Sequence, residues 1–160
     1  MFVPFEELDN EARVWVYPAS RPFTDAEVVE ISQKLEDFLT QWTAHGSSLN
    51  ASFSLPYNRF IVIALDENAQ SATGCSIDAS VRIIQELEKT YNVVLLDKMN
   101  ISFKQGEYIT YKSIADFKAM VKSKSVSENT LVFNNLVLNK DEFLSEWEVP
   151  AKDSWHARYF

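Results

Sequence analysis

The single cysteine and the two histidines are the residues of this chain best suited to chemistry. Cys75 lies in the stretch ATGCSIDASVRII, directly after a glycine and at what the pattern predicts to be a helix start. The free backbone amides of a first helical turn stabilise a thiolate, and a histidine such as His45 or His156 would take up the proton. Asp66 would orient that histidine, as the carboxylate of a catalytic triad does. These four candidate catalytic residues point to a thiol-dependent enzyme or a redox-responsive protein.

A second hypothesis, which the sequence favours, needs no reactive thiol. Asp66 and Glu67 follow an apolar stretch that is typical of a strand, and ligands often gather at such strand ends. The loop after them carries Cys75, Ser76 and Asp78. We therefore expect a small-ligand or protein-interaction module whose site is formed by Asp66, Cys75, Ser76 and Asp78. In this alternative Ser76 or Asp78 caps the helix, and Cys75 packs inward as a small apolar residue.

The two histidines also have ordinary roles that require no catalysis. His45 precedes Gly46 at the predicted end of a helix, where a cation complements the helix dipole, and His156 would be a surface residue of the C-terminal tail. The acidic residues near Cys75 show no spacing typical of metal ligands. We expect no metal site and no cofactor.

Composition limits the class of protein. The chain has 160 residues, of which 46% are hydrophobic and 13% aromatic, which predicts one folded domain over residues 1–160. A net charge of -8 argues against nucleic acid as a partner. One cysteine suits a reducing compartment, the N-terminus lacks a basic signal segment, and the longest apolar run, Phe60–Leu65, is too short to cross a bilayer. We expect a cytoplasmic protein without membrane insertion, whose partner is a small molecule or a protein, itself included.

The pattern of apolar residues predicts the elements that would position these side chains. Thr24 and Glu27 form a capping box that opens a helix running to Gly46, and a second helix begins near Ser76 or Asp78. Further helices follow Ser113 and Asn139, the latter ended by Pro150. Strands are expected at 13–19, 51–55, 59–67, 93–96, 101–105, 107–112 and 130–134.

The order of these elements predicts an α+β fold with a mixed or antiparallel sheet. The first six match the split βαβ, ferredoxin-like arrangement, and a C-terminal β-α-β-α extension follows. The strand from Phe60 to Leu65 has no polar alternation, so we expect it to be central and covered on both faces. The aromatic tail SWHARYF would be costly to leave in water, and we expect it to dock on the protein's own core.

The segments NRFIVIALDE, GCSIDASV, TLVFNNLV and SWHARYF resemble those of an uncharacterised bacterial family of about this length. The resemblance covers nearly the whole chain, and members of that family often carry the label "ABC transporter ATPase". A Walker A loop needs the pattern G-x-x-x-x-G-K-[ST], which none of the three glycines here can begin. The resemblance therefore implies no activity or catalytic residue, and the sequence predicts that the protein does not bind ATP tightly.

Overall fold

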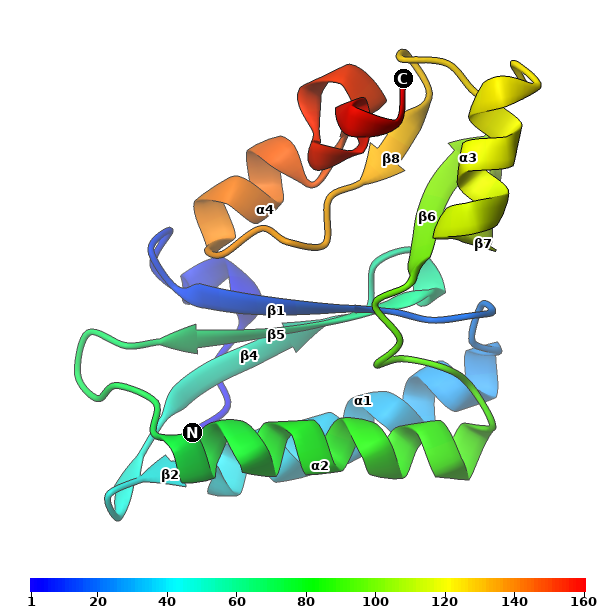
Figure 1. The fold of residues 1–160 in the computed structure, drawn as a ribbon. Helices are drawn as coiled ribbons and strands as arrows, with labels where there is room; N and C mark the ends of the chain where they lie inside the picture. The colour runs from blue at the N-terminus through cyan, green and yellow to red at the C-terminus, as the bar shows by residue number, and fades with distance from the viewer.

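Two antiparallel sheets lie against each other in the structure, a computed structural model that describes all of residues 1–160 (Figure 1). The first sheet has the order β1-β5-β4, and the second has the order β7-β6-β8-β9. Their strands are β1 (Arg13–Pro18), β4 (Asn50–Ser54), β5 (Phe60–Asp66), β6 (Asn100–Gln105), β7 (Tyr108–Ser113), β8 (Leu131–Phe133) and β9 (Glu148–Pro150). The protein is therefore an α+β protein, as the sequence predicts.

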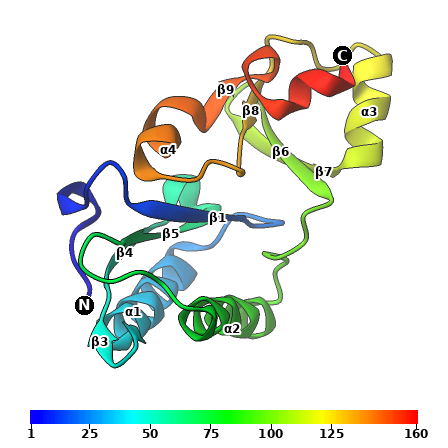
Figure 2. The ribbon, with the colours of Figure 1, turned by 60° about the vertical axis from the view of Figure 1, so that its left-hand side comes forward.

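Helices cover both sheets (Figures 1 and 2). α1 and α2 lie on one face of the first sheet, α4 lies on its other side, and α3 packs beside the second sheet. Their bounds are α1 (Asp25–Gln41), α2 (Gly74–Tyr91), α3 (Ile114–Lys122) and α4 (Lys140–Glu146). Shorter elements are the hairpin of β2 (Thr43–Ala44) and β3 (Ser47–Ser48) and the 3-10 turns η1 (Phe5–Glu7), η2 (Pro56–Asn58), η3 (Ala151–Asp153) and η4 (Trp155–Tyr159).

The central strand β5 is covered on both faces, which confirms the prediction made for the apolar run Phe60–Leu65. Every residue of that run is buried. Ile61, Ile63 and Leu65 pack against α1 and α2, whereas the alternate residues Phe60, Val62 and Ala64 pack with Phe133, Phe143 and Trp147. The C-terminal third of the chain thus covers the face of the first sheet that its own helices leave open.

The first sheet has the split βαβ arrangement but lacks its fourth strand. β5 lies between β1 and β4 and runs antiparallel to both. The segment Val93–Leu96, predicted to be a strand, is not one. The carboxylate of Glu88 accepts hydrogen bonds from the backbone amides of Leu95 and Leu96 at 2.7 and 3.0 Å. These amides are consequently withdrawn from strand pairing, and β1 is left as an edge strand.

The ends of α1 and α4 differ from their predicted bounds by a few residues. The capping box of Thr24 and Glu27 is present, but α1 ends at Gln41 rather than continuing to Gly46. His45 and Gly46 instead form the turn between β2 and β3, with φ angles of 51° and 77°. The last helix, α4, stops at Glu146, so Pro150 belongs to β9 and does not end the helix.

The C-terminal tail is folded onto the protein itself, as predicted. Tyr159 and Phe160 make edge contacts with the ring of Phe117 on α3, at centroid distances of 6.1 and 6.2 Å. Trp155 and Tyr159 pack against the buried cluster of the second sheet, and His156 is completely buried. The prediction that His156 is a surface residue was therefore wrong.

No helix of the protein combines the length and the apolar character that crossing a membrane requires.

Candidate ligand-binding cleft

The start of α2, where the sequence predicts a site, uses its polar groups to hold its own backbone. Thr73 is the N-cap, and its hydroxyl and that of Ser76 form a reciprocal capping box. Asp66 accepts a hydrogen bond from the amide of Asn68, and Glu67 accepts one from the amide of Ala72. The helix therefore begins at Gly74, earlier than predicted, and neither Ser76 nor Asp78 is its N-cap.

Cys75 is exposed, which contradicts the prediction that it packs inward. The reason is the position of the helix start. Because successive helical residues point about 100° apart, the turn that buries Ser76 and Ser80 directs Cys75 outward. Ile77 and Val81 are half-buried on the flank of the same helix face.

The structure does not assemble the proposed group of thiol, histidine and carboxylate. His156 lies in the tail, which the two ribbon views show far from the start of α2 (Figures 1 and 2). His45 is exposed in the β2–β3 hairpin, and β2 contacts α2, but no hydrogen bond joins His45 to Cys75. Asp78 is exposed. No three side chains of the types His, Cys, Asp and Glu lie together as metal ligands would.

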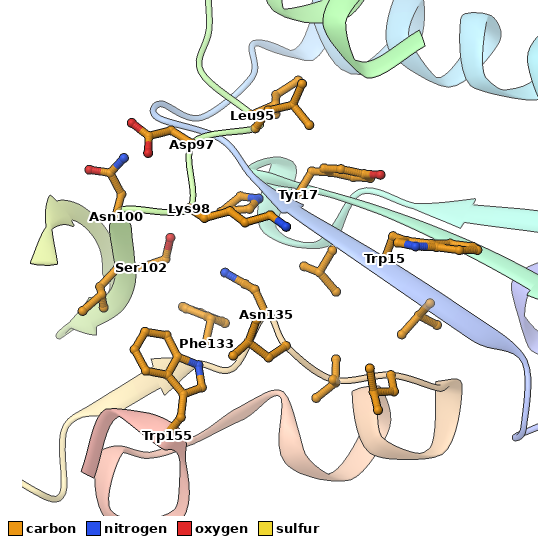
Figure 3. A pocket seen from close by; sticks show the side chains of 18 of the residues that line it. Trp15, Tyr17, Leu95, Asp97, Lys98, Asn100, Ser102, Phe133, Asn135 and Trp155 are labelled. Carbon is orange, nitrogen blue, oxygen red and sulfur yellow. The ribbon is translucent and has the colours of Figure 1, made fainter. Parts of the chain in front are cut away.

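A cleft of about 570 Å³ lies elsewhere, along the edge strand β1 between the two sheets (Figure 3). This volume is within the ordinary range for small-molecule sites. One side is formed by α2 and the segment after it, and the other by β6, β8, the loop from Asn135 to Leu138 and the start of the tail. Neither Cys75 nor Asp66 lines this cleft.

The edge of β1 presents unpaired backbone groups to the cleft. Val14 donates its amide to the carbonyl of Leu138, away from β5, whereas Ala19 donates its amide to Arg59 on the β5 side. Because backbone groups alternate in direction along a strand, the amide and carbonyl of Val16 point away from β5. No hydrogen bond of Val16 reaches the segments on that side. At the far end of the edge, Ser20 donates its amide to the carbonyl of Val94.

Two aromatic residues at the start of the tail close one side of the cleft. Trp155 stacks on His156 with a centroid distance of 3.8 Å. His156 exchanges a hydrogen bond of 2.8 Å with the hydroxyl of Ser154 through Nδ1, but its Nε2 and the indole Nε1 of Trp155 are buried without a partner. Burial, and secondarily the charge of Arg158, lowers the pKa of His156 to about 4. The imidazole is therefore neutral at pH 7.

Several other side chains of the cleft offer hydrogen-bond donors. Lys98 forms no ion pair, and Figure 3 shows its ammonium group reaching toward Tyr17 and Asn135. Asn135 accepts a bond from the indole of Trp147 through Oδ1, which leaves its amide nitrogen free. Burial raises the pKa of Tyr17, so its hydroxyl stays protonated. These donors lie beside the acceptor oxygens of Asp97, Asn100 and Ser102, which also line the cleft.

Contacts that bridge the two sheets fix the width of the cleft. Arg59 donates to the carbonyl of Ile109 in β7 at 2.7 Å and to the carbonyl of Ser20 beyond β1 at 3.1 Å. Phe60 of the first sheet packs against Phe133 of the second with a centroid distance of 4.8 Å. The cleft therefore has walls that are held in place without a ligand.

Of the candidate site residues named from the sequence, which are His45, Asp66, Cys75, Ser76, Asp78 and His156, only His156 lines this cleft. The cleft depends on two backbone features that no motif records, the absent fourth strand and the unpaired edge of β1. One available signal was the aromatic tail, which marks Trp155 as a residue that must find a partner surface.

Comparisons of the chain with protein-family models, with curated proteins and with solved structures find no match.

Proposed function

We propose that the protein is a binding protein that holds an elongated, largely apolar ligand in the cleft along β1. The observation that supports this most strongly is the combination of a preformed cleft of about 570 Å³ with unpaired polar groups in its wall. The hypothesis of a ligand or interaction module is kept, but its site moves from residues 66–78 to the cleft, because the polar groups of the loop are engaged in turns and caps.

The lining indicates a ligand with an apolar body. Val16, Leu96 and Val137 line the cleft together with the aromatic rings of Trp15 and Trp155. Removing such surface from water contributes about 25 cal/mol for each Å² buried, which favours an apolar ligand over a sugar or a free nucleotide.

The polar groups indicate that the ligand carries hydrogen-bond acceptors. Lys98, the amide nitrogen of Asn135 and the backbone amide of Val16 are donors without a partner. A carbonyl or carboxylate of the ligand would accept hydrogen bonds from such donors. The preferred ligand is therefore apolar with carbonyl or anionic groups.

The test uses a fluorescent anilinonaphthalene sulfonate dye, which is apolar and carries one negative charge. We expect saturable binding of one dye per chain. The substitution Val16→Trp fills the cleft and should weaken binding at least about tenfold, equivalent to about 1.4 kcal/mol. Val29→Trp introduces the same change at a position of α1 that is 70% exposed, and it should leave binding unchanged. Equal dye binding by Val16→Trp and the native protein would refute the proposal.

A second candidate function retains some support, because Cys75 is exposed beside the hairpin that carries His45. The indole of Trp42 donates to the carbonyl of Ser76 and ties this hairpin to the start of α2. For a thiol-dependent reaction, His45→Ala should slow alkylation of Cys75 by iodoacetamide at neutral pH at least about tenfold. An unchanged rate in His45→Ala would remove this candidate.

A further inference from the structure

We propose that the occupant of the cleft is an extended peptide segment of a partner protein, which pairs with β1 as the missing fourth strand of the first sheet. This inference rests on the proposed function, because it names the ligand of the same cleft. It adds a specific claim, that the ligand binds through its backbone as well as through its side chains.

The backbone groups along the edge of β1 have the arrangement that a strand requires. The amide of Val14 is taken by Leu138 at one end, and Ser20 is bonded to Val94 at the other. Between these two contacts the carbonyl of Val14, both groups of Val16 and the carbonyl of Pro18 face outward. Six residue steps of strand span roughly 20 Å, so the opening accepts a short extended segment.

The cleft extends to both faces of the first sheet, as the side chains of an added strand would require. Trp15 and Tyr17 line it on the side of α2, whereas Val14 and Val16 belong to the cluster on the opposite face. Figure 3 shows Trp15 and Tyr17 on one side of the β1 ribbon and Phe133 on the other. Successive side chains of a strand point to opposite faces, so a peptide here would place alternate residues in the two halves. A compact small molecule would use only one of them.

The segment Val93–Leu96, which would be the protein's own fourth strand, is bonded to α2 instead of β1. Leu95 and Leu96 donate their amides to Glu88, and only Val94 touches the edge, through Ser20. The opening is therefore a feature of the folded protein, because closing it would require breaking the two bonds to Glu88.

Charge favours a partner peptide with an acidic residue. Arg13 and Lys98 line the cleft without ion-pair partners, against the single carboxylate of Asp97, in a chain whose net charge is -8. A second copy of β1 would bring another Arg13 and no carboxylate, so self-pairing fits the charge less well. Exposed Leu136 and Leu138 at the rim offer further apolar contact to a longer partner.

The experiment selects peptides and then tests their backbones. Blocked hexapeptides with alternating apolar residues and one glutamate are screened against the native protein and against Val16→Trp. From the peptides whose binding is weakened by Val16→Trp, the tightest binder is chosen. Its backbone amides are then methylated one at a time, which removes one donor and changes no side chain. We expect methylation at alternate positions to weaken binding about tenfold or more, and methylation at the positions between them to have little effect.

The outcomes separate this inference from the proposed function. One outcome is that Val16→Trp weakens dye binding but weakens the binding of none of the peptides. That result would overturn strand addition and leave the cleft as a small-molecule site. Equal sensitivity to methylation at every position would also overturn it. Dye binding that Val16→Trp leaves unchanged would remove the proposed function itself. Dimers of the free protein that Val16→Trp dissociates would replace the peptide by a second copy.

Discussion

The start of α2 and the cleft along β1 both gather polar groups beside a strand, but they use them differently. At the start of α2 the hydroxyls of Thr73 and Ser76 bond to each other's backbone, and Glu67 bonds to a loop amide. In the cleft the backbone of Val16, Nε2 of His156 and Nε1 of Trp155 have no partner. At the start of α2 the polar groups are hydrogen-bonded within the local structure, whereas in the cleft they are unpaired.

This difference shows why residue type is a weak guide to a site. Cys75, Asp66 and Asp78 have the side chains that are more typical of a functional site, yet none of them lines the cleft. Unpaired buried groups cost free energy, so a fold retains them chiefly where a ligand, water or strain accounts for them. If the contrast holds, changes in the wall of the cleft should have larger effects than changes at the start of α2.

Removal of residues 155–160 should destabilise the protein strongly, because it removes one wall of the cleft and uncovers Phe117. The lost burial of His156 and of the rings of Trp155 and Tyr159 corresponds to about 3 to 5 kcal/mol, or a fall in Tm of roughly 10 °C. Differential scanning calorimetry measures this change. Deletion of Phe160 alone, which is 39% exposed, is the control and should lower Tm much less. An unchanged Tm in the longer deletion would mean that the tail is not part of the cleft wall.

Acid should destabilise the fold through His156. Its pKa is lowered from 6.5 to about 4 by burial. Between these pH values His156 is therefore protonated in the unfolded chain and neutral in the folded chain. The contribution is fully present above pH 6.5 and falls as pH drops toward 4, by as much as about 3 kcal/mol. Urea unfolding at several pH values measures it. The variant His156→Gln should lose this part of the pH dependence, and a slope equal to that of the native protein would contradict the burial of His156.

Much of the first sheet and its helices follows from local signals. The capping box of Thr24 and Glu27 and the central strand Phe60–Leu65 are each specified by neighbouring residues, and each is confirmed. Val93–Leu96 has an equally strand-like composition but fails, because Glu88, several residues away, captures its amides. The apolar run is visible in the sequence, but the competition of the Glu88 carboxylate with a neighbouring strand for these amides is not.

The cleft was beyond prediction for a related reason. Its main polar groups are backbone atoms of Val16, and every residue except proline carries the same amide and carbonyl. Whether they are paired depends on which segment lies beside β1, which is decided by contacts distant along the chain. The tail was predictable as a docked segment, but its contact with the cleft was not, because the second sheet positions Trp155 and His156.

A smaller effect is expected at the start of α2. Thr73→Ala removes the N-cap and should lower the free energy of unfolding by about 1 kcal/mol. Dye binding to the folded protein should stay the same, because the cap is distant from the cleft. A loss of dye binding in Thr73→Ala, measured where the protein remains folded, would show that the two regions are coupled.

The smallest effect is expected from Cys75→Ser, because the side chain is exposed and forms no hydrogen bond. Surface substitutions of this kind usually change stability by less than about 0.5 kcal/mol. The thiol of the native protein should also react with iodoacetamide nearly as fast as that of the unfolded protein. Strong protection of the native thiol, detected by mass spectrometry, would restore the inward-packed position predicted from the sequence.

The most direct test of the central claim compares the two regions in one measurement. Titration of the ¹⁵N-labelled protein with the anilinonaphthalene sulfonate dye, followed by amide chemical shifts, should perturb Val16, Lys98 and Asn135. The amides of Cys75, Ser76 and Asp78 should remain unchanged. Shifts confined to those three residues, with Val16 unaffected, would contradict the assignment of the cleft along β1 as the ligand site.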